Sequence, residues 1–183
     1  MNNCKIRLVE EDDILVLYEH LKEFLETPNA STTGNPLPKF DDSKKFVTKY
    51  LNDNEHHEYD NWYMVINNNN EILGNVYIKK DNTIAYHITK KYQKQGFGES
   101  AVKLLMKENP RNVYFSVVNI KNEPSIQFTK KLNFKEKSYI FEKRNNNSET
   151  DTEELWQIFK WAILNQSIIM NESFIEIDGK RIG

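Results

Sequence analysis

The most informative stretch of the sequence reads Tyr92-Gln93-Lys94-Gln95-Gly96-Phe97-Gly98-Glu99-Ser100. It joins a run typical of a strand, residues 83–88, to an amphipathic run typical of a helix, residues 96–108. The first turn of a helix presents unpaired N–H groups and a partial positive charge, and glycines there let an anion approach the backbone. The stretch therefore predicts a phosphate site. A close helix–strand contact is the alternative reason for the two glycines.

Two common nucleotide-binding motifs do not fit this stretch. The dinucleotide pattern G-x-G-x-x-G would need a third glycine at the position that Ala101 occupies. The phosphate-loop pattern G-x-x-x-x-G-K-[ST] does not occur in the chain. The predicted anion site is therefore of another kind.

The rest of the chain mixes helical and strand periodicity, which predicts an α+β fold. A four-asparagine turn joins two strands into an antiparallel hairpin, and residues 83–118 predict a right-handed parallel crossover. Asp41 or Asp42 is the expected cap of the second helix. Asp178-Gly179 indicates a short terminal hairpin within residues 173–183. The expected strands are 5–9, 62–66, 72–78, 83–88, 113–118, 134–141 and 155–164, and the expected helices are 11–26, 43–51, 96–108 and 122–132.

Length and charge restrict the function classes. The chain has 183 residues and a formal net charge of -2, which fits one domain over residues 1–183, with a core at 5–164 and an extension at 165–183. The charge argues against a nucleic-acid partner, and no long apolar run predicts a membrane span. A single cysteine, Cys4, suits a reducing compartment, so a cytoplasmic location is expected. Adjacent His56 and His57 do not complete a metal site, and no metal is expected.

Three motifs together resemble the GNAT superfamily of N-acetyltransferases, in particular its RimJ/RimL-like branch. Gln93-x-x-Gly96-x-Gly98 is similar to the family's Q/R-x-x-G-x-G/A motif. Asn122-Glu123-Pro124-Ser125-Ile126, which leads into Lys130-Lys131-Leu132-Asn133-Phe134, resembles its second signature, and residues 84–88 resemble its fourth strand. The resemblance covers residues 5–141 in element order and is specific at residues 72–134.

The resemblance implies a mixed, mostly antiparallel central sheet with helices on both faces and a splayed parallel strand pair. It also implies acetyl-CoA as cofactor, with its pantetheine arm in the gap between the fourth and fifth strands. The pyrophosphate would lie on the amides of residues 95–99, while Asn122 would bind the pantetheine or cap its helix. The other residues that it places near the cofactor are Ile88, Thr89, Gln93, Lys94, Gln95, Gly96, Phe97, Gly98, Glu99, Ser125 and Lys130.

The sequence departs from the family pattern at two catalytic positions. Thr129 stands where many members place a tyrosine that protonates the leaving thiolate, and Ser125 is the other hydroxyl expected to reach the sulfur. Asn82 and Thr83 stand where many members place a glutamate base. His87 is the nearest titratable group on that strand, so it is the candidate base, with a packed structural histidine as the alternative.

These features predict an acetyl-CoA-dependent N-acetyltransferase that acts on a primary amine of a small molecule, such as an amino sugar, a polyamine or an antibiotic. The alternatives are a protein N-terminal acetyltransferase, a catalytically weak acetyl-CoA-binding module, and an interaction protein in which the glycines only serve packing. A second copy of the chain, forming a homodimer, stays open as a partner.

Overall fold

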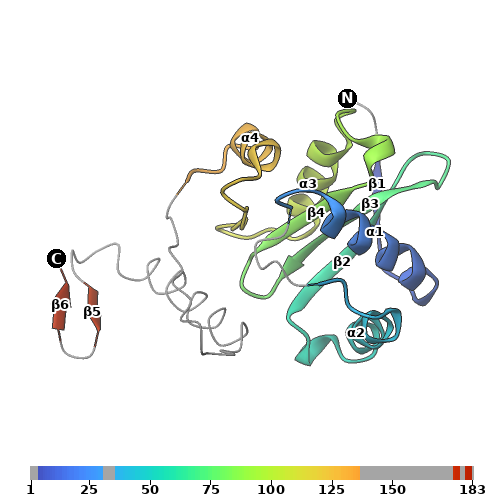
Figure 1. Cartoon of the computed structure of the whole chain (residues 1–183), viewed down its shortest axis with the longest axis horizontal. Helices are drawn as coiled ribbons and strands as arrows, with labels where there is room; N and C mark the ends of the chain where they lie inside the picture. Colours follow the sequence, from blue (N-terminus) through green and yellow to red (C-terminus); the bar gives the residue numbers. More distant parts are fainter. Residues whose placement is uncertain (1–3, 31–35, 137–174, 178–179, 183) are drawn as a thin grey trace. The chain divides into compact units, whose positions relative to one another are not determined.

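The structure is a computed structural model that describes residues 4–30, 36–136, 175–177 and 180–182 (Figure 1). The chain divides into two compact units, Met1–Glu136 and Lys137–Gly183. In the first unit, four antiparallel strands form a sheet in chain order: β1 (Lys5–Leu8), β2 (Tyr59–Ile66), β3 (Ile72–Lys79) and β4 (Ile84–Ile88). The hairpin predicted across the asparagine turn is the β2–β3 pair.

Helices cover both faces of this sheet, as the sequence predicts. The short helix η1 (Glu11–Asp13), α1 (Ile14–Glu26) and α2 (Phe40–Asn52) pack on one face, over a core that contains Trp62, Met64 and Ile66. The other face packs against α3 (Phe97–Glu108), over a core that contains Val76 and Leu105, and residues of α4 (Glu123–Lys131) join this core. Two single-turn helices, η2 (Asn54–His56) and η3 (Lys90–Tyr92), precede β2 and follow β4.

The second helix begins earlier than expected and has a different cap. Lys39 is the N-cap of α2, and no side chain caps the helix there. Asp41 and Asp42, the predicted caps, lie inside the first turn. They still favour the helix, because negative side chains near an N-terminus interact well with the helix dipole.

The predicted fifth strand is wrong in part. Residues 113–118 form only an isolated parallel bridge between Thr83 and Phe115. At this bridge the Ile84 N–H donates to the Phe115 carbonyl over 2.8 Å, and the Phe115 N–H donates to the Asn82 carbonyl over 3.0 Å. No further backbone hydrogen bond joins residues 116–118 to β4, all of which the structure describes. The predicted splayed pair is therefore present as one parallel bridge, between Thr83 and Phe115, and beyond this bridge the edge of β4 is not paired with residues 116–118.

The terminal hairpin is confirmed as β5 (Ile175–Ile177) paired with antiparallel β6 (Lys180–Ile182). The strand predicted at residues 155–164 lies outside the described residues. Of the strand predicted at 134–141, the structure describes only residues 134–136, and these are not in a strand. No helix in the described part of the chain is long and apolar enough to cross a membrane.

Candidate active site

The start of α3 lacks any side-chain cap, which leaves its first amides available. Gly96 is the N-cap and has a positive φ of 87°, a conformation that glycine adopts without strain. No side chain hydrogen-bonds at the cap, and the first N–H of the ladder is that of Ser100, which donates to the Gly96 carbonyl over 3.2 Å. The amides of Phe97, Gly98 and Glu99 therefore have no intrahelical partner and can bind an anion.

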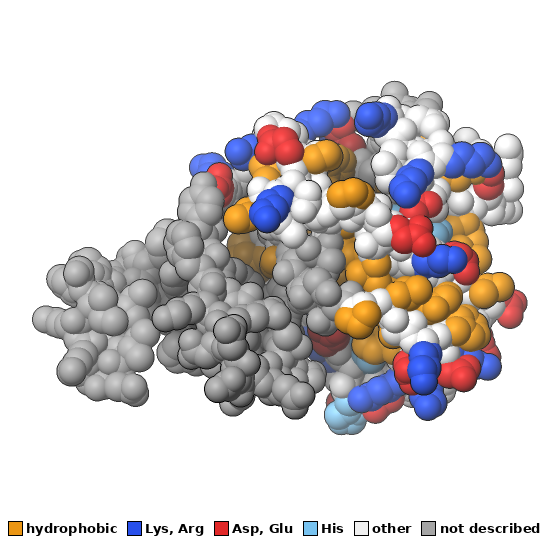
Figure 2. All heavy atoms as spheres, in the orientation of Figure 1, with side chains coloured by type: hydrophobic (Ala, Val, Ile, Leu, Met, Phe, Trp, Pro, Cys, Tyr) orange, Lys and Arg blue, Asp and Glu red, His pale blue; other side chains and the backbone are white. Residues whose placement is uncertain are grey.

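The side chains around this helix start are mainly basic. Glu99 lies in the first turn, where Lys103 and Lys131 each approach one of its carboxylate oxygens to 2.7 Å. Hydrogen bonds from Lys103 and then Lys131 hold the pKa of Glu99 at about 2. One carboxylate against two ammonium groups leaves a net positive charge beside the free amides. Figure 2 shows lysine and arginine side chains along the upper edge of this face.

The free edge of β4 lies next to the start of α3. Because the Ile84 N–H points to Phe115, strand alternation directs the N–H and C=O of Tyr86 to the same outer edge. No backbone hydrogen bond pairs these two groups with any other described residue. At the end of the strand, a Cβ built on Gly98 would lie 3.6 Å from the Ile88 side chain and 3.4 Å from the Phe128 ring. A thin polar chain with an anionic end fits this edge and the amides beyond it.

The backbone groups predicted to face the cofactor need correction by one position. The Thr89 N–H donates to the Leu73 carbonyl over 3.0 Å, so it continues the β3 ladder and does not face the gap. The Ile88 carbonyl faces the gap but accepts a hydrogen bond from the Gln93 side chain over 2.8 Å. Among the described residues, the Ile88 N–H and both backbone groups of Tyr86 remain without a backbone partner on this edge. A shift of one residue reverses the direction of the backbone groups, which explains the error.

The loop side chains are mostly engaged in holding the turn. Gln93 ties the turn to the end of β4, and the Gln95 amide donates to the Lys91 carbonyl over 2.9 Å. Lys94 has a positive φ of 59° and an exposed side chain. Of the three side chains predicted to donate to a phosphate, Gln93, Lys94 and Gln95, Lys94 is therefore the one that has no hydrogen-bond partner among the described residues.

The residues predicted on α4 come together with a tyrosine that sequence reasoning missed. Asn122 is the N-cap of α4, and its side chain accepts from the Ser125 N–H over 3.2 Å, as the capping alternative predicts. The Thr129 hydroxyl donates to the Ser125 carbonyl over 2.8 Å, so its single proton is in use. Burial raises the pKa of Tyr86 to about 12, and the neighbouring Ser125 and Thr129 side chains act in the opposite direction. Lys130 is exposed and lies 3.9 Å from Glu136.

His87 points to the opposite face of β4, against α1. Strand alternation holds here, since Ile84 and Ile88 enter the α3-side core while the His87 ring lies 5.3 Å from that of His20. The His87 side chain is only 12% exposed. Its Nε2 lies 3.3 Å from Glu23 Oε1 but lacks hydrogen-bond geometry and has no partner among the described residues. Burial and then the charge of Lys90 lower the pKa of His87 to about 4, so the ring is neutral at neutral pH.

A buried hydrogen-bond chain fixes the protonation of His20. Trp62 Nε1 can only donate, and it donates to Asn75 Oδ1 over 3.1 Å. The Asn75 amide nitrogen therefore faces His20 Nδ1, 3.0 Å away, and Nδ1 must accept. Burial and then the neighbouring His87 lower the pKa of His20 to about 4. The neutral ring thus carries its hydrogen on Nε2, the nitrogen without a partner within the described residues.

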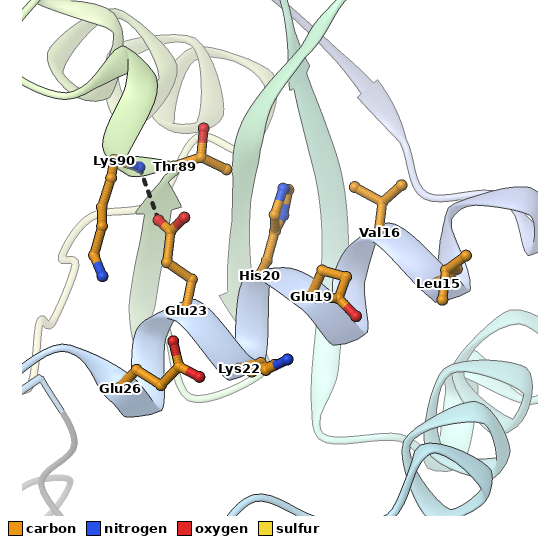
Figure 3. Close-up of a pocket in the computed structure, with 9 residues that line it drawn as sticks. All are labelled: Leu15, Val16, Glu19, His20, Lys22, Glu23, Glu26, Thr89 and Lys90. Atoms are coloured by element: carbon orange, nitrogen blue, oxygen red, sulfur yellow. Dashed lines mark hydrogen bonds between the residues drawn. The ribbon is translucent and has the colours of Figure 1, made fainter.

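A groove of about 590 Å³ opens along α1, with His20 among the residues that line it (Figure 3). Figure 3 shows Glu23 reaching from α1 toward the backbone of Lys90, whose N–H donates to Glu23 Oε1 over 2.8 Å. We call this feature the α1 groove, and it is lined by Leu15, Val16, Glu19, His20, Lys22, Glu23, Glu26, Thr89 and Lys90. Three carboxylates against two ammonium groups give the α1 groove a net charge of −1 while His20 is neutral.

Gly74 of β3 lies against the backbone of the last residues of β4, where a side chain would not fit. A Cβ at Gly74 would lie 2.0 Å from the His87 carbonyl oxygen and 2.9 Å from the Ile88 Cα. Backbone atoms at such distances cannot accommodate a side chain. The close approach lies opposite the last residues of β4, between the α1 groove and the start of α3.

Comparison with known proteins identifies the family. Residues 17–134 match the acetyltransferase (GNAT) family. The chain belongs to this family. Because GNAT enzymes transfer the acetyl group of acetyl-CoA, the chain is an acetyl-CoA-dependent N-acetyltransferase. No curated protein matches the sequence.

Solved structures with the same fold include three acetyltransferases. A spermidine/spermine N-acetyltransferase from Vibrio cholerae is 15% identical with a TM-score of 0.60, over 75% of this chain and 82% of that chain. An N-acetyltransferase from Staphylococcus aureus is 17% identical with a TM-score of 0.57, over 73% and 84%. A phosphinothricin acetyltransferase from Sinorhizobium meliloti, solved with AcCoA, is 12% identical with a TM-score of 0.56, over 70% and 73%.

Proposed function

We propose that this GNAT enzyme acetylates a primary amine of a small molecule, such as a polyamine, an amino sugar or an antibiotic. The observation that supports the proposal is that an anion-binding helix start and an acidic groove both lie at the end of β4. The uncapped start of α3 and the unpaired edge at Tyr86 lie toward one face, and the acidic α1 groove lies on the other. A phosphate-bearing donor and a cationic acceptor can therefore reach the same strand end from opposite sides.

Acetyl-CoA, when bound, supplies an acetyl group activated as a thioester. The amides of Phe97, Gly98 and Glu99 would hold its phosphates, and the backbone of Tyr86 would pair with the pantetheine arm as an added strand does. The Tyr86 hydroxyl stays protonated at neutral pH, so it can donate a hydrogen bond to a leaving thiolate in place of Thr129. The acceptor must attack as the free amine, because only an unprotonated nitrogen has a lone pair.

The spermidine/spermine N-acetyltransferase of similar fold supports a polyamine among these acceptors. The charge of the α1 groove also favours a cationic amine. Membership of the RimJ/RimL-like branch, a cytoplasmic location, a homodimer and a single domain over residues 1–183 stay predictions, because the family match does not distinguish them.

A catalytically weak acetyl-CoA-binding module is the second candidate. The observation that favours it is the Thr129 hydroxyl, whose proton is donated to the Ser125 carbonyl, together with the lack of a carboxylate on β4 itself. Such a module would bind coenzyme A and release no thiol.

A thiol-release assay with purified full-length protein tests the proposal. The acceptors are polyamines, amino sugars, an aminoglycoside and a peptide with a free N-terminus, each compared with an amine-free control. We expect release above the control with at least one small amine. Release with the peptide alone would favour a protein N-terminal acetyltransferase. Thermal stabilisation by coenzyme A without release from any amine would favour the binding module.

A further inference from the structure

The carboxylate of Glu23 is placed differently from every other acid of the α1 groove. Its side chain is 26% exposed, whereas Glu19 and Glu26 are exposed. The Lys90 N–H holds Oε1 in place over 2.8 Å, while Oε2 has no partner among the described residues. A carboxylate with one oxygen fixed to the backbone and the other free is preorganised to bind a donor.

No cation of the described residues neutralises Glu23. Neither Lys22 nor Lys90 forms an ion pair with it, although both line the α1 groove, and Figure 3 shows their ammonium ends directed away from it. Its close titratable neighbours include His87 and His20, and both rings are neutral at neutral pH. A partly buried carboxylate without a cation is costly, so an incoming ammonium group would complete the site.

The second observation that indicates a ligand is the unused nitrogen of His20. His20 is 6% exposed and lines the α1 groove one turn before Glu23. Its Nδ1 is occupied by Asn75, and its Nε2–H has no partner among the described residues. His87 Nε2 is likewise buried and unpartnered. The Nε2–H of neutral His20 can only donate, so it suits an acceptor atom of a ligand and not an ammonium nitrogen. His87 Nε2, in a ring that approaches Glu23 Oε1 to 3.3 Å, is the buried nitrogen beside this carboxylate that the described residues leave unsatisfied.

We propose that Glu23 is the residue that binds the acceptor's ammonium group, through Oε2, in the part of the α1 groove that lies beside the buried ring of His87. The inference rests on the proposed function and adds the contact that selects a cationic acceptor. Anchoring by the Lys90 N–H places the ammonium group beside the last residues of β4, where the start of α3 approaches from the opposite face. Glu19 and Glu26 extend the negative charge along the helix at intervals of about one or two turns, which suits a linear polyamine.

Calorimetric titration with spermidine, on the full-length protein, tests the inference. Glu23→Gln keeps an oxygen for the Lys90 N–H and removes the charge. Glu11→Gln removes the same charge from η1, outside the α1 groove, and is the matched control. We expect the spermidine Kd to rise about tenfold or more in Glu23→Gln and less than about twofold in the control. Coenzyme A should stabilise all three proteins to the same extent, and this readout also reports whether each variant is folded.

The salt dependence of binding separates a charge contact from a change in shape. Screening weakens interactions between charges, so rising salt should weaken spermidine binding in the wild type and weaken it less in Glu23→Gln. Equal affinities of the wild type and Glu23→Gln would overturn the inference. So would the same loss in Glu11→Gln, or the absence of spermidine binding in the wild type.

Thiol release measured in parallel separates this inference from the proposed function. Turnover of spermidine that Glu23→Gln leaves unchanged, in both kcat and KM, overturns the inference alone. Binding of spermidine that depends on Glu23, without turnover of any amine, contradicts the proposed function alone.

Discussion

The two faces of β4 differ in charge, in the groups they offer and in how they are built. Toward α3, the site consists of main-chain amides, glycines and lysines, and its main requirement is that Gly96 provides no cap. Toward α1, it consists of the side chains of Glu23, His20 and His87, and hydrogen bonds to distant elements hold Glu23 and His20. The difference indicates that a fixed, phosphate-bearing donor binds through the backbone on one face. The acceptor is selected by replaceable side chains on the other.

The largest effect is expected from Gly96→Asp, which changes the α3 face alone. Aspartate is one of the residues that tolerate a positive φ, so the fold should persist while its carboxylate competes for the amides of Gly98 and Glu99. A negative charge within about 4 Å of a phosphate costs several kcal/mol, so we expect coenzyme A affinity to fall about 100-fold or more. Calorimetry with coenzyme A measures it. Gly96→Asn, which caps without a charge, should lose less affinity, and equal affinities of the two variants would contradict the electrostatic argument.

Gly74→Ala is expected to affect both faces, because it changes the strand that separates them. The new Cβ would lie 2.0 Å from the His87 carbonyl oxygen, so backbone must move. We expect a loss of about 2–4 kcal/mol in the free energy of unfolding, measured by urea denaturation. Gly98→Ala is the matched control, since its Cβ would meet the Phe128 ring at an ordinary 3.4 Å. If Gly74→Ala lowers the free energy of unfolding no more than Gly98→Ala does, the result would contradict the close approach of β3 to β4.

The pH dependence of stability reports on the α1 face. The pKa of His20 and the pKa of His87 are both about 4 in the folded chain, below the ordinary histidine value of 6.5, because burial disfavours the charged rings. The unfolded chain therefore binds more protons between about pH 4 and pH 6.5, and stability falls as pH drops through this window. Each histidine should cost about 1–2 kcal/mol at pH 5 relative to pH 7.

Urea denaturation at the two pH values checks this expectation with a histidine variant. His87→Asn should be less sensitive to acid than the wild type, and His56→Asn, which changes an exposed ring, should not. An unchanged pH dependence in His87→Asn would show that His87 is not buried in its neutral form.

The smallest effect is expected from Glu99→Gln on the α3 face. Removing the carboxylate frees Lys103 and Lys131 to face an anion, so coenzyme A should bind more tightly, by less than about threefold. Both lysine side chains are exposed to solvent, which weakens their ion pairs with Glu99, so the melting temperature should change little. Weaker binding of coenzyme A in this variant would mean that the lysines do not face the phosphates.

Sequence reasoning predicted the α3 face better than the α1 face, for a physical reason. Gly96 and Gly98 act within one turn of the chain, so a local pattern identifies the helix start and its free amides. Residues 113–118 have strand-like composition, but composition does not specify how far two strands stay paired, and only the Thr83–Phe115 bridge forms.

His87 of the α1 face was singled out from the sequence, but His20 and Glu23 were missed because their partners are distant in sequence. His20 is hydrogen-bonded to Asn75, and Glu23 to Lys90. One signal was present in the sequence. His20 lies three residues after Leu17 on the buried stripe of α1, and a polar residue on an apolar stripe needs a partner. The role of Tyr86 was missed because it depends on the position of α4 relative to β4.

A crystal structure with coenzyme A and spermidine would test most directly that β4 receives its two ligands from opposite faces. The account predicts phosphate density at the amides of Phe97–Glu99, the pantetheine arm along the edge at Tyr86, and an ammonium group within hydrogen-bond distance of Glu23 Oε2. Coenzyme A lying in the α1 groove, or residues 113–118 fully paired with β4 in the complex, would contradict it.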